Sequence, residues 1–298
     1  MSSTSAQIVP IVKERSQSGL VWRQFRRHKL AVASAIILIL LALMSIFAEQ
    51  ISPHDPNATN TSYAHGKPQP PSAEYIFGTD NFGRDYFART LVGTRISLLV
   101  GVTAVAFQLV IGIAVGAVSG YFGGWIDNLL MRITDVFLSV PAFLLLLIMA
   151  GILGGSLLAL IFVIGALNWM TVARLVRAEI LSLKEREFVI AGQSIGVPAW
   201  RLIVVYLLPN CAASIIVAAT LAVPSAILTE SALSFLGLGV PPPNASLGNM
   251  LGDAQQWLRT AWWIWVVPGV AISLIVLAFN FIGDGLRDAL DPQLRDSR

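Results

Sequence analysis

Polar side chains gather in a few short segments of this sequence, and their types suit ion pairing and helix capping rather than bond-breaking chemistry. Segment 78–85 combines two glycines with carboxylates and a guanidinium, a composition typical of a turn that leads into a helix. We expect Asp80 to cap that helix, which continues through Ile96 along the membrane surface; contact with a second protein is the alternative. The residues of this segment are Gly78, Thr79, Asp80, Gly83, Arg84 and Asp85.

Composition places the chain in a lipid bilayer. Hydrophobic residues make up 55% and charged residues 12% of its 298 residues, whereas a soluble domain has about 25% charged residues. The apolar runs lack period-2 alternation, so they predict membrane-spanning helices rather than barrel strands. We predict an all-α integral membrane protein with six transmembrane helices and no affinity for nucleic acid. The six runs cover 30–48, 96–119, 136–153, 157–173, 212–235 and 261–283.

Basic residues predict the orientation of these helices. Of the 20 Lys and Arg residues, 15 fall in segments on the same side as the N-terminus. Basic residues concentrate on the cytoplasmic side of membrane proteins, so we predict that both termini are cytoplasmic. The expected segments are a cytoplasmic start 1–29, a first transmembrane helix 30–48, an extracytoplasmic loop 49–95 with an amphipathic helix, a core 96–285 of five transmembrane helices, and a cytoplasmic tail 286–298.

Patterns typical of catalysis or metal binding are missing from the sequence. No G-x-x-x-x-G-K-[ST] segment occurs, because Gly66-Lys67 is followed by Pro68, so the chain lacks the phosphate-binding loop needed to hydrolyse ATP. The three histidines lie outside the apolar runs and Cys211 is the single cysteine, which disfavours a membrane-embedded serine protease and a metal cluster. We expect no catalytic residue, no metal site and no cofactor in this chain.

The polar interruption between the fourth and fifth apolar runs predicts a cytoplasmic helical hairpin over 177–209. Gly196 suits the left-handed end of its first helix, and Pro198 precedes the second helix. The hairpin either lies on lipid headgroups or docks into a groove of a soluble partner, and small residues at its tip favour close approach of a partner. The residues expected to form this contact are Glu187, Ala191, Gly192, Ser194, Gly196, Arg201 and Pro209.

A further polar segment lies near the C-terminal end of the sequence. Asp284, Arg287, Asp288 and Asp291 recur at helical spacing, so Arg287 can pair with Asp284 or Asp291. Each such pair contributes only tenths of a kcal/mol, roughly 0.3–0.5. Either the segment stabilises a helix end at the inner interface, or it packs against the hairpin or a soluble partner.

Three residues within the apolar runs are candidates for a transport pathway. Glu230 is the one acidic residue inside a predicted span, and charges at such positions usually face the protein interior or a wet cavity. We expect an interfacial or ion-paired carboxylate, with binding of a transported amine as the alternative. Pro141, close to Ser139, predicts a kink in the third span that is either packed or lines the pathway.

Three glycines at intervals of four predict close helix packing in the second span. Gly112, Gly116 and Gly120 lie on one face of that helix, where small residues allow two backbones to approach. The neighbouring helix belongs either to this chain or to a second subunit.

Four stretches follow one another in a fixed order, 77–85, 191–209, 234–243 and 279–292. Together they resemble the "C" permease of the dipeptide/oligopeptide/nickel subfamily of ATP-binding-cassette (ABC) importers. The resemblance extends from Val21 to Pro292, and the hairpin is similar to the cytoplasmic "EAA" signature of such permeases. Ile190 and Gly192 stand where that signature usually has an acidic residue and an alanine, and Glu187 is the nearby acidic residue.

The resemblance implies a type I ABC importer permease fold in the inner or plasma membrane of a prokaryote. It also implies partners: a paralogous permease, two cytoplasmic ATPase subunits that use ATP and Mg, and an external substrate-binding protein. The hairpin then becomes the element that couples to the ATPases. Di- or oligopeptides are the expected cargo, delivered by the binding protein, and the chain itself is not expected to be an enzyme.

Other functions stay open at this point. The same subfamily resemblance admits nickel chelates, glutathione or oligosaccharides as cargo. A secondary transporter that works without ATP is less favoured, because such proteins usually place several charges near the midplane and these spans are almost free of charge. A membrane enzyme is disfavoured by the missing catalytic groups.

Overall fold

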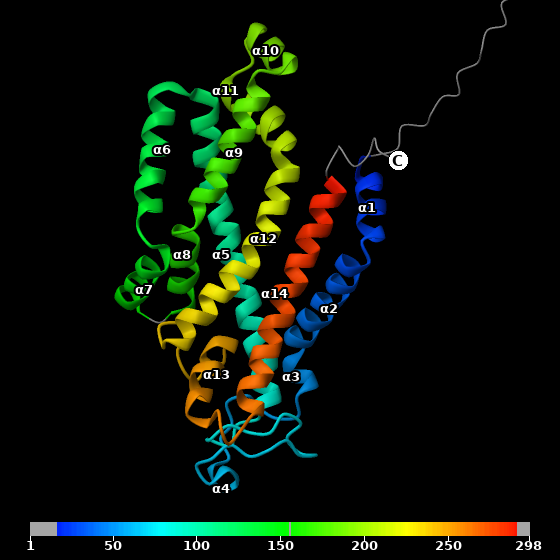
Figure 1. The fold of residues 1–298 in the computed structure, drawn as a ribbon, viewed down its shortest axis with the longest axis vertical. Coiled ribbons are helices and arrows are strands. Elements are labelled where there is room, and N and C mark those ends of the chain that lie inside the picture. The colour runs from blue at the N-terminus through cyan, green and yellow to red at the C-terminus, as the bar shows by residue number, and fades with distance from the viewer. Residues whose placement is uncertain (1–16, 155, 291–298) are drawn as a thin grey trace, which may run out of the picture.

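The computed structural model describes residues 17–154 and 156–290, and within them the chain is helical without β-strands. Four helical runs are long and apolar enough to cross a membrane (Figure 1). The all-α membrane class is therefore confirmed. The four runs are α2 (Lys29–Ile46), α5 (Tyr86–Phe122), the continuous helix Ala199–Phe235 and α14 (Trp263–Leu290).

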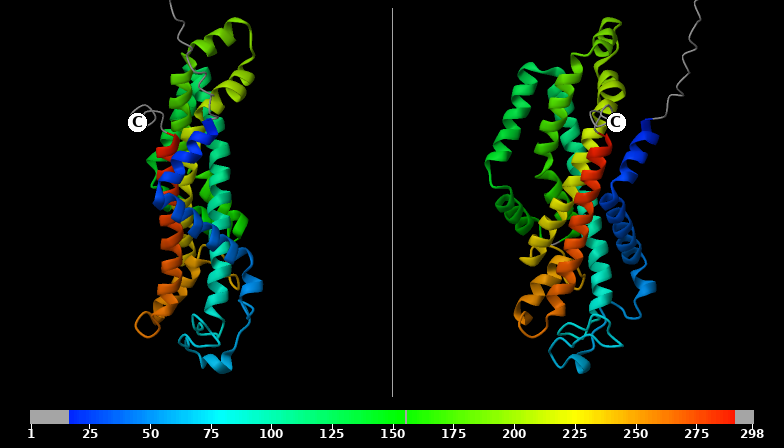
Figure 2. Two further views of the ribbon diagram at one scale, coloured as in Figure 1. Left: turned by 90° about the vertical axis from the view of Figure 1, so that its right-hand side faces the viewer. Right: turned by 45° about the vertical axis from the view of Figure 1, so that its right-hand side comes forward.

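The third and fourth predicted spans are bent pairs of helices. The first pair bends by 85° and the second by 40°. In Figure 2 the first pair lies on the opposite side of the bundle from α2. Each pair is long enough to cross a membrane if it is counted as one span. The pairs are α6 (Gly124–Ser139) with α7 (Ala142–Leu153), and α8 (Leu157–Ala166) with α9 (Trp169–Lys184).

Pro141 accounts for the sharper of the two bends. Proline lacks an amide hydrogen and disfavours helical backbone at the residue before it, and Val140 is extended with φ −90° and ψ 135°. The expected kink is confirmed, but the prediction of a single helix over 136–153 is wrong. The helix α6 begins twelve residues earlier, at Gly124, and stops at the proline.

The second predicted span begins ten residues early, because α5 starts at Tyr86. Its cap is Asp85, whose carboxylate accepts hydrogen bonds from the backbone N–H groups of Phe87 (2.8 Å) and Ala88 (3.3 Å). The prediction that Asp80 caps this helix is therefore wrong. The amphipathic helix expected within the outer loop is instead the first part of α5, so it does not lie separately along the membrane surface.

The fifth predicted span also begins earlier than expected. A π-helical segment, Leu202–Leu207, joins α11 (Ala199–Arg201) to α12 (Leu208–Phe235) without a break. Pro209 lies near the start of α12, and the wider turn before it accommodates a residue that has no N–H to donate. Pro209 therefore lies inside the continuous helix and does not mark its entry.

Shorter helices fill the two ends of the bundle. The tail predicted from residue 286 is helical as far as Leu290, because α14 continues through it. Figure 1 shows α4 and α13 at one end and α10 at the other. The shorter helices are α1 (Gln17–Arg27), α3 (Ala48–Ile51), α4 (Thr61–Ala64), α10 (Glu187–Ser194), α13 (Leu247–Ala254) and a 3-10 turn (Gln255–Trp257).

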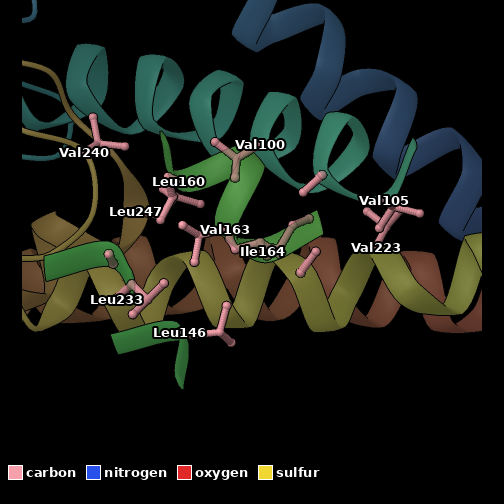
Figure 3. Packing of buried hydrophobic residues seen from close by; sticks show 14 of the residues in the cluster. Val100, Val105, Leu146, Leu160, Val163, Ile164, Val223, Leu233, Val240 and Leu247 are labelled. Carbon is pink, nitrogen blue, oxygen red and sulfur yellow. The ribbon is translucent and has the colours of Figure 1, made fainter. Parts of the chain in front are cut away.

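The main hydrophobic core lies where α5, α8, α12 and α14 meet. Val100 from α5, Ile164 from α8, Ile227 from α12 and Ile275 from α14 are almost fully buried there. Figure 3 shows Val100, Val163 and Leu233 pointing into the space between the helices. This core holds α8 and α12 on α5, a helix of 37 residues.

The three glycines of the second span face another helix of this chain, at the point where α5 crosses α9. A Cβ atom added at Gly112 would lie 2.6 Å from Cβ of Val172 and 2.9 Å from the carbonyl oxygen of Trp169. One added at Gly120 would lie 2.9 Å from the carbonyl oxygen of Arg177. The backbones of α5 and α9 are therefore in direct contact, as the small residues predicted.

Replacing Gly112 by alanine should destabilise the chain, whereas Gly269→Ala should not. Gly112 faces α9 at contact distance, while Gly269 in α14 has open space around its Cβ position. Overpacking costs about 1–3 kcal/mol, and alanine in an open helical site gains roughly 0.5–1 kcal/mol. Thermal unfolding of the purified protein in detergent measures the difference, and equal midpoints for the two variants would contradict the assigned packing.

Candidate functional site

The helix α10 stands apart from the bundle at the end opposite α4 (Figure 1). Only residues 185 and 186 separate it from α9, and residues 195–198 separate it from α11. The first helix of the hairpin predicted over 177–209 is divided into two, because Arg186 has extended backbone with φ −73° and ψ 144°. The predicted hairpin is therefore a short helix held between two long ones.

The C-terminal turn of α10 has the hydrogen bonds of a Schellman motif. Val197 donates its N–H to the Gly192 carbonyl and Gly196 donates its N–H to the Gln193 carbonyl, each at 3.0 Å. Gly196 has φ +77°, a conformation that glycine adopts without a steric penalty. The predicted glycine end of this helix is confirmed, and it fixes the direction in which the chain returns to the bundle.

One side chain anchors α10 and several others are exposed. Val189 is fully buried against Ile180, Leu207 and Cys211. Gly192 is half-buried, and a Cβ atom added there would lie 2.9 Å from the Leu202 side chain. The remaining hairpin candidates Glu187, Ala191, Ser194, Gly196, Arg201 and Pro209 are exposed.

Large apolar side chains are exposed around α10 as well. The exposed fraction is 51% for Ile190, 82% for Ile195 and 61% for Trp200, and Phe188 is also exposed. Phe188 and Ile190 are two residues apart, which places them on different sides of a helix. The apolar surface of α10 therefore surrounds the tip and does not form one lipid-facing stripe.

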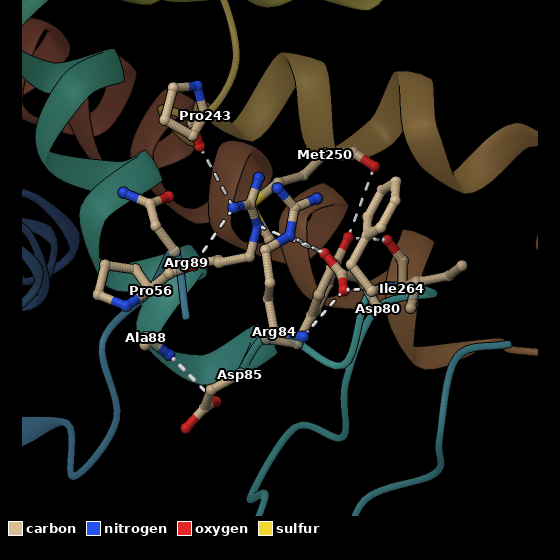
Figure 4. Close-up of polar contacts among 12 residues, drawn as sticks. Pro56, Asp80, Arg84, Asp85, Ala88, Arg89, Pro243, Met250 and Ile264 are labelled. Atoms are coloured by element: carbon tan, nitrogen blue, oxygen red, sulfur yellow. Dashed lines mark hydrogen bonds and ion pairs between the residues drawn. The ribbon is translucent and has the colours of Figure 1, made fainter. Parts of the chain in front are cut away.

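The glycine-rich segment 78–85 forms a polar cluster at the other end of the bundle (Figure 4). Asp80 accepts hydrogen bonds from the backbone N–H groups of Phe82 (2.9 Å) and Arg84 (3.0 Å), and its carboxylate pairs with the Arg84 guanidinium at 2.6 Å. Gly78 and Gly83 have φ of +73° and +75°, and Thr79 is fully buried. The expected glycine turn is confirmed.

Arg89 and His54 complete this polar cluster, and the sequence patterns did not point to either residue. Arg89 is 3% exposed and donates to the carbonyl oxygens of Pro56 (3.3 Å) and Pro243 (3.4 Å). His54 contacts the Asp85 carboxylate at 2.7 Å. Partial burial raises the pKa of the nearby Asp253 carboxyl above its usual value, although the guanidinium groups of the cluster oppose the rise. These contacts tie together three loops at the α4 end of the bundle.

Glu230 is neither interfacial nor ion-paired within the described part of the chain, so that expectation is wrong. Its side chain is fully buried and accepts hydrogen bonds from the hydroxyls of Ser97 (2.8 Å) and Ser234 (2.7 Å). Ser97 belongs to α5, so this carboxylate joins α12 to α5. The candidates Ser139 and Pro141 lie exposed at the bend between α6 and α7.

The C-terminal segment packs against the start of the chain. Asp288 lies 4.0 Å from the His28 imidazole, and a Cβ at Gly285 would contact Ala31 of α2. The pair of Arg287 with Asp284 that the spacing allowed does not form among the described residues. Asp291, the other possible partner, lies outside the described residues. Within the described residues this segment packs on α1 and α2, which favours the stabilised helix end over the alternative of packing on the hairpin.

An ion pair that the sequence did not reveal fastens α6 to α9. The Arg177 guanidinium donates to both carboxylate oxygens of Asp127, at 2.5 and 2.6 Å, and the Ser119 hydroxyl of α5 also donates to Asp127. The two charged residues are 50 positions apart. A lone charge near an apolar run is the only signal that could have marked either residue beforehand.

Two family models match the chain. Residues 112–296 match the binding-protein-dependent transport system inner membrane component, and residues 16–71 match the N-terminal transmembrane domain of oligopeptide transport permease C. The first match covers more than half of the chain and includes α9, α10 and α12. The projecting hairpin therefore belongs to the part that the family shares.

Curated proteins match over almost the whole length. The oligopeptide transport system permease protein OppC of Bacillus subtilis is 43% identical over 91% of this chain and 88% of its own. The dipeptide transport system permease protein DppC of Alkalihalophilus pseudofirmus is 44% identical over 92% and 89%. The di/tripeptide transport system permease protein DppC of Pseudomonas aeruginosa is 38% identical over 93% and 92%. This chain thus belongs to the binding-protein-dependent transport system inner membrane components, the membrane permeases of ABC importers.

Proposed function

We propose that this chain is one of two permease subunits in a type I ABC importer that carries di- or oligopeptides across the plasma membrane of a prokaryote. The names of its relatives support the peptide cargo. Partner subunits supply the energy from ATP and Mg, since this sequence has no phosphate-binding loop. The observation that carries the proposal is α10, which projects from the bundle with apolar side chains exposed.

The proposed topology has six spans, with each bent pair counted as one and both termini in the cytoplasm. The concentration of 15 of the 20 basic residues on one side supports this orientation. The helix α10 is then cytoplasmic, and the cluster around Asp80 and Arg89 is extracytoplasmic. Two cytoplasmic ATPases, a paralogous permease and an external binding protein complete the importer.

Docking of α10 into an ATPase explains its surface better than adsorption to lipid does. A helix at the lipid interface has one apolar face and one charged face. In α10 the exposed apolar residues point to different sides, and Ile195 at its end is 82% exposed. A groove that encloses the tip covers all of these side chains at once.

The connections of α10 suit the transmission of movement. On one side a two-residue link joins it to α9, and on the other side the Schellman turn leads into the continuous helix Ala199–Phe235. Val189 fixes α10 on both of these helices through its contacts with Ile180 and Leu207. Displacement of α10 by closing ATPases therefore displaces α9 and α12.

Peptides are the favoured cargo over nickel chelates, glutathione or oligosaccharides because the relatives are peptide permeases by name. An ATP-independent secondary transporter is the less favoured alternative. It would need ion-binding groups near the midplane, and Glu230, the acidic residue in α12, is enclosed by protein.

Ile195→Glu should uncouple ATP hydrolysis from transport. The side chain touches little of its own chain, so folding and membrane insertion should survive. A charge placed in a desolvated interface should weaken attachment of the ATPases by about tenfold or more. Co-purification of the ATPases and peptide-stimulated ATP hydrolysis in proteoliposomes measure the effect.

Ile195→Leu is the matched control, because it keeps an apolar side chain of the same volume and should retain coupling. Gly196→Val should resemble Ile195→Glu, since a β-branched residue is strained at φ +77° and would redirect the turn. Normal co-purification and uptake in both Ile195→Glu and Gly196→Val would contradict docking of α10 on an ATPase.

The cognate binding protein should be stabilised by di- or oligopeptides. A thermal-shift screen that compares peptides, glutathione, a nickel chelate and oligosaccharides tests this, because a bound ligand raises the midpoint of unfolding. A binding protein that responds to sugars and to no peptide would overturn the proposed cargo and leave the permease assignment intact.

A further inference from the structure

A polar hollow runs along one face of the bundle, where α5, α9 and α12 meet. Its volume is about 480 Å³, and neither the family models nor the sequence patterns assign it a role. It lies apart from Glu230, Ser139 and Pro141, none of which lines it. The polar residues that line it are Gln108, Asn168, Thr171, Ser225 and Thr229.

Gln108 is the most informative of these residues. It lies within α5 and is 5% exposed. Its amide makes no hydrogen bond within 17–154 and 156–290, and it is not among the unpaired groups that the protein fully encloses there. An unpaired polar group costs several kcal/mol in hydrocarbon, about 2–7. The amide lines the hollow, so water or a polar ligand in the hollow is the partner that it lacks.

The other polar groups also leave hydrogen-bonding capacity toward the hollow. Asn168 uses its amide nitrogen on the Ile164 carbonyl at 2.7 Å, which leaves its side-chain oxygen available to accept. The Thr229 hydroxyl donates to the Ser225 carbonyl at 2.8 Å and can still accept. Lipid offers no partner for these groups, which favours a wetted surface over a lipid-facing one.

The lining is neutral as well as polar. It includes apolar side chains such as Val172, Leu175 and Leu221 and no Asp, Glu, Lys or Arg. Amides and hydroxyls on an apolar floor match the N–H and C=O groups of a peptide backbone, which carry no formal charge. Because the lining has no charged group, it does not discriminate between peptides by the charge of their side chains, and peptides of varied sequence can cross it.

The hollow continues toward α10. A second hollow of about 600 Å³ shares Leu175, Ala218 and Leu221 with the first, and it extends to Asn210 and Arg287 near the other end of α12. The two together follow the seam between α9 and α12, the helices to which α10 is attached. A movement of α10 therefore changes the width of this seam.

We propose that this groove is the wall that the chain contributes to the translocation pathway, and that its neutral amide and hydroxyl groups hydrogen-bond the backbone of a passing peptide. The identity of the cargo rests on the proposed function, whereas the wetting of the groove does not. The pathway is thereby assigned to α5, α9 and α12 and not to the buried Glu230 or the bend at Pro141.

Cysteine labelling in the assembled importer tests the wetting directly. Cys211 is fully buried and is replaced by serine to give the background. Ser225→Cys and Thr229→Cys place thiols in the groove, and Leu228→Cys places one beside them on the exposed apolar surface. A charged methanethiosulfonate added to both sides of proteoliposomes reacts only with a hydrated thiolate. The groove positions should react about tenfold faster or more, and labelling as slow as at Leu228→Cys would overturn the inference whatever the cargo.

Two further measurements test backbone recognition. A peptide-loaded binding protein with ATP should slow labelling of Thr229→Cys, and Gln108→Leu should lower peptide uptake about tenfold while Gln108→Asn restores part of it. Protection by an oligosaccharide alone would overturn the peptide cargo and backbone recognition, and it would leave the wetted groove supported. Full uptake in Gln108→Leu, with fast labelling retained, would overturn backbone recognition alone.

Discussion

The direct contact between the backbones of α5 and α9 is the constraint on which the rest of the structure depends. Because Gly112 and Gly120 have no side chains, α9 lies against α5 along several turns, and the ion pair of Asp127 with Arg177 extends the contact to α6. α9 in turn supports α10 at its C-terminal end and lines the polar groove near its N-terminal end. Close packing of an ordinary kind thus fixes the position of both functional elements.

Features set by neighbouring residues could be predicted from the sequence, and features set by distant residues could not. The turn at Gly196 and the bend at Pro141 follow from backbone geometry within a few residues. The ion pair of Arg177 with Asp127 and the hydrogen bond of Ser97 with Glu230 join residues 50 and 133 positions apart, and no periodicity reports such contacts. Asp85 and not Asp80 caps α5, because the Asp80 carboxylate already accepts hydrogen bonds from N–H groups of its own loop and from the Arg84 guanidinium.

The groove could not be predicted from the sequence either, because its residues are far apart along the chain. Gln108 belongs to α5, Asn168 to the link before α9 and Thr229 to α12, and each is a single uncharged polar residue among apolar ones. Only the fold brings them to one surface. Glu230 attracted attention as a lone charge, yet its hydrogen bonds with serine hydroxyls make it a link between helices.

The unbroken helix Ala199–Phe235 has a mechanical consequence. At 1.5 Å per residue, its 37 residues form a rod of about 55 Å, with the α10 turn at one end and the serine-bound carboxylate of Glu230 near the other. Glu230 pins this second end to α5. A sideways push at the α10 end then swings the rod about this pivot, so the groove widens or narrows most near α10 and least near Glu230.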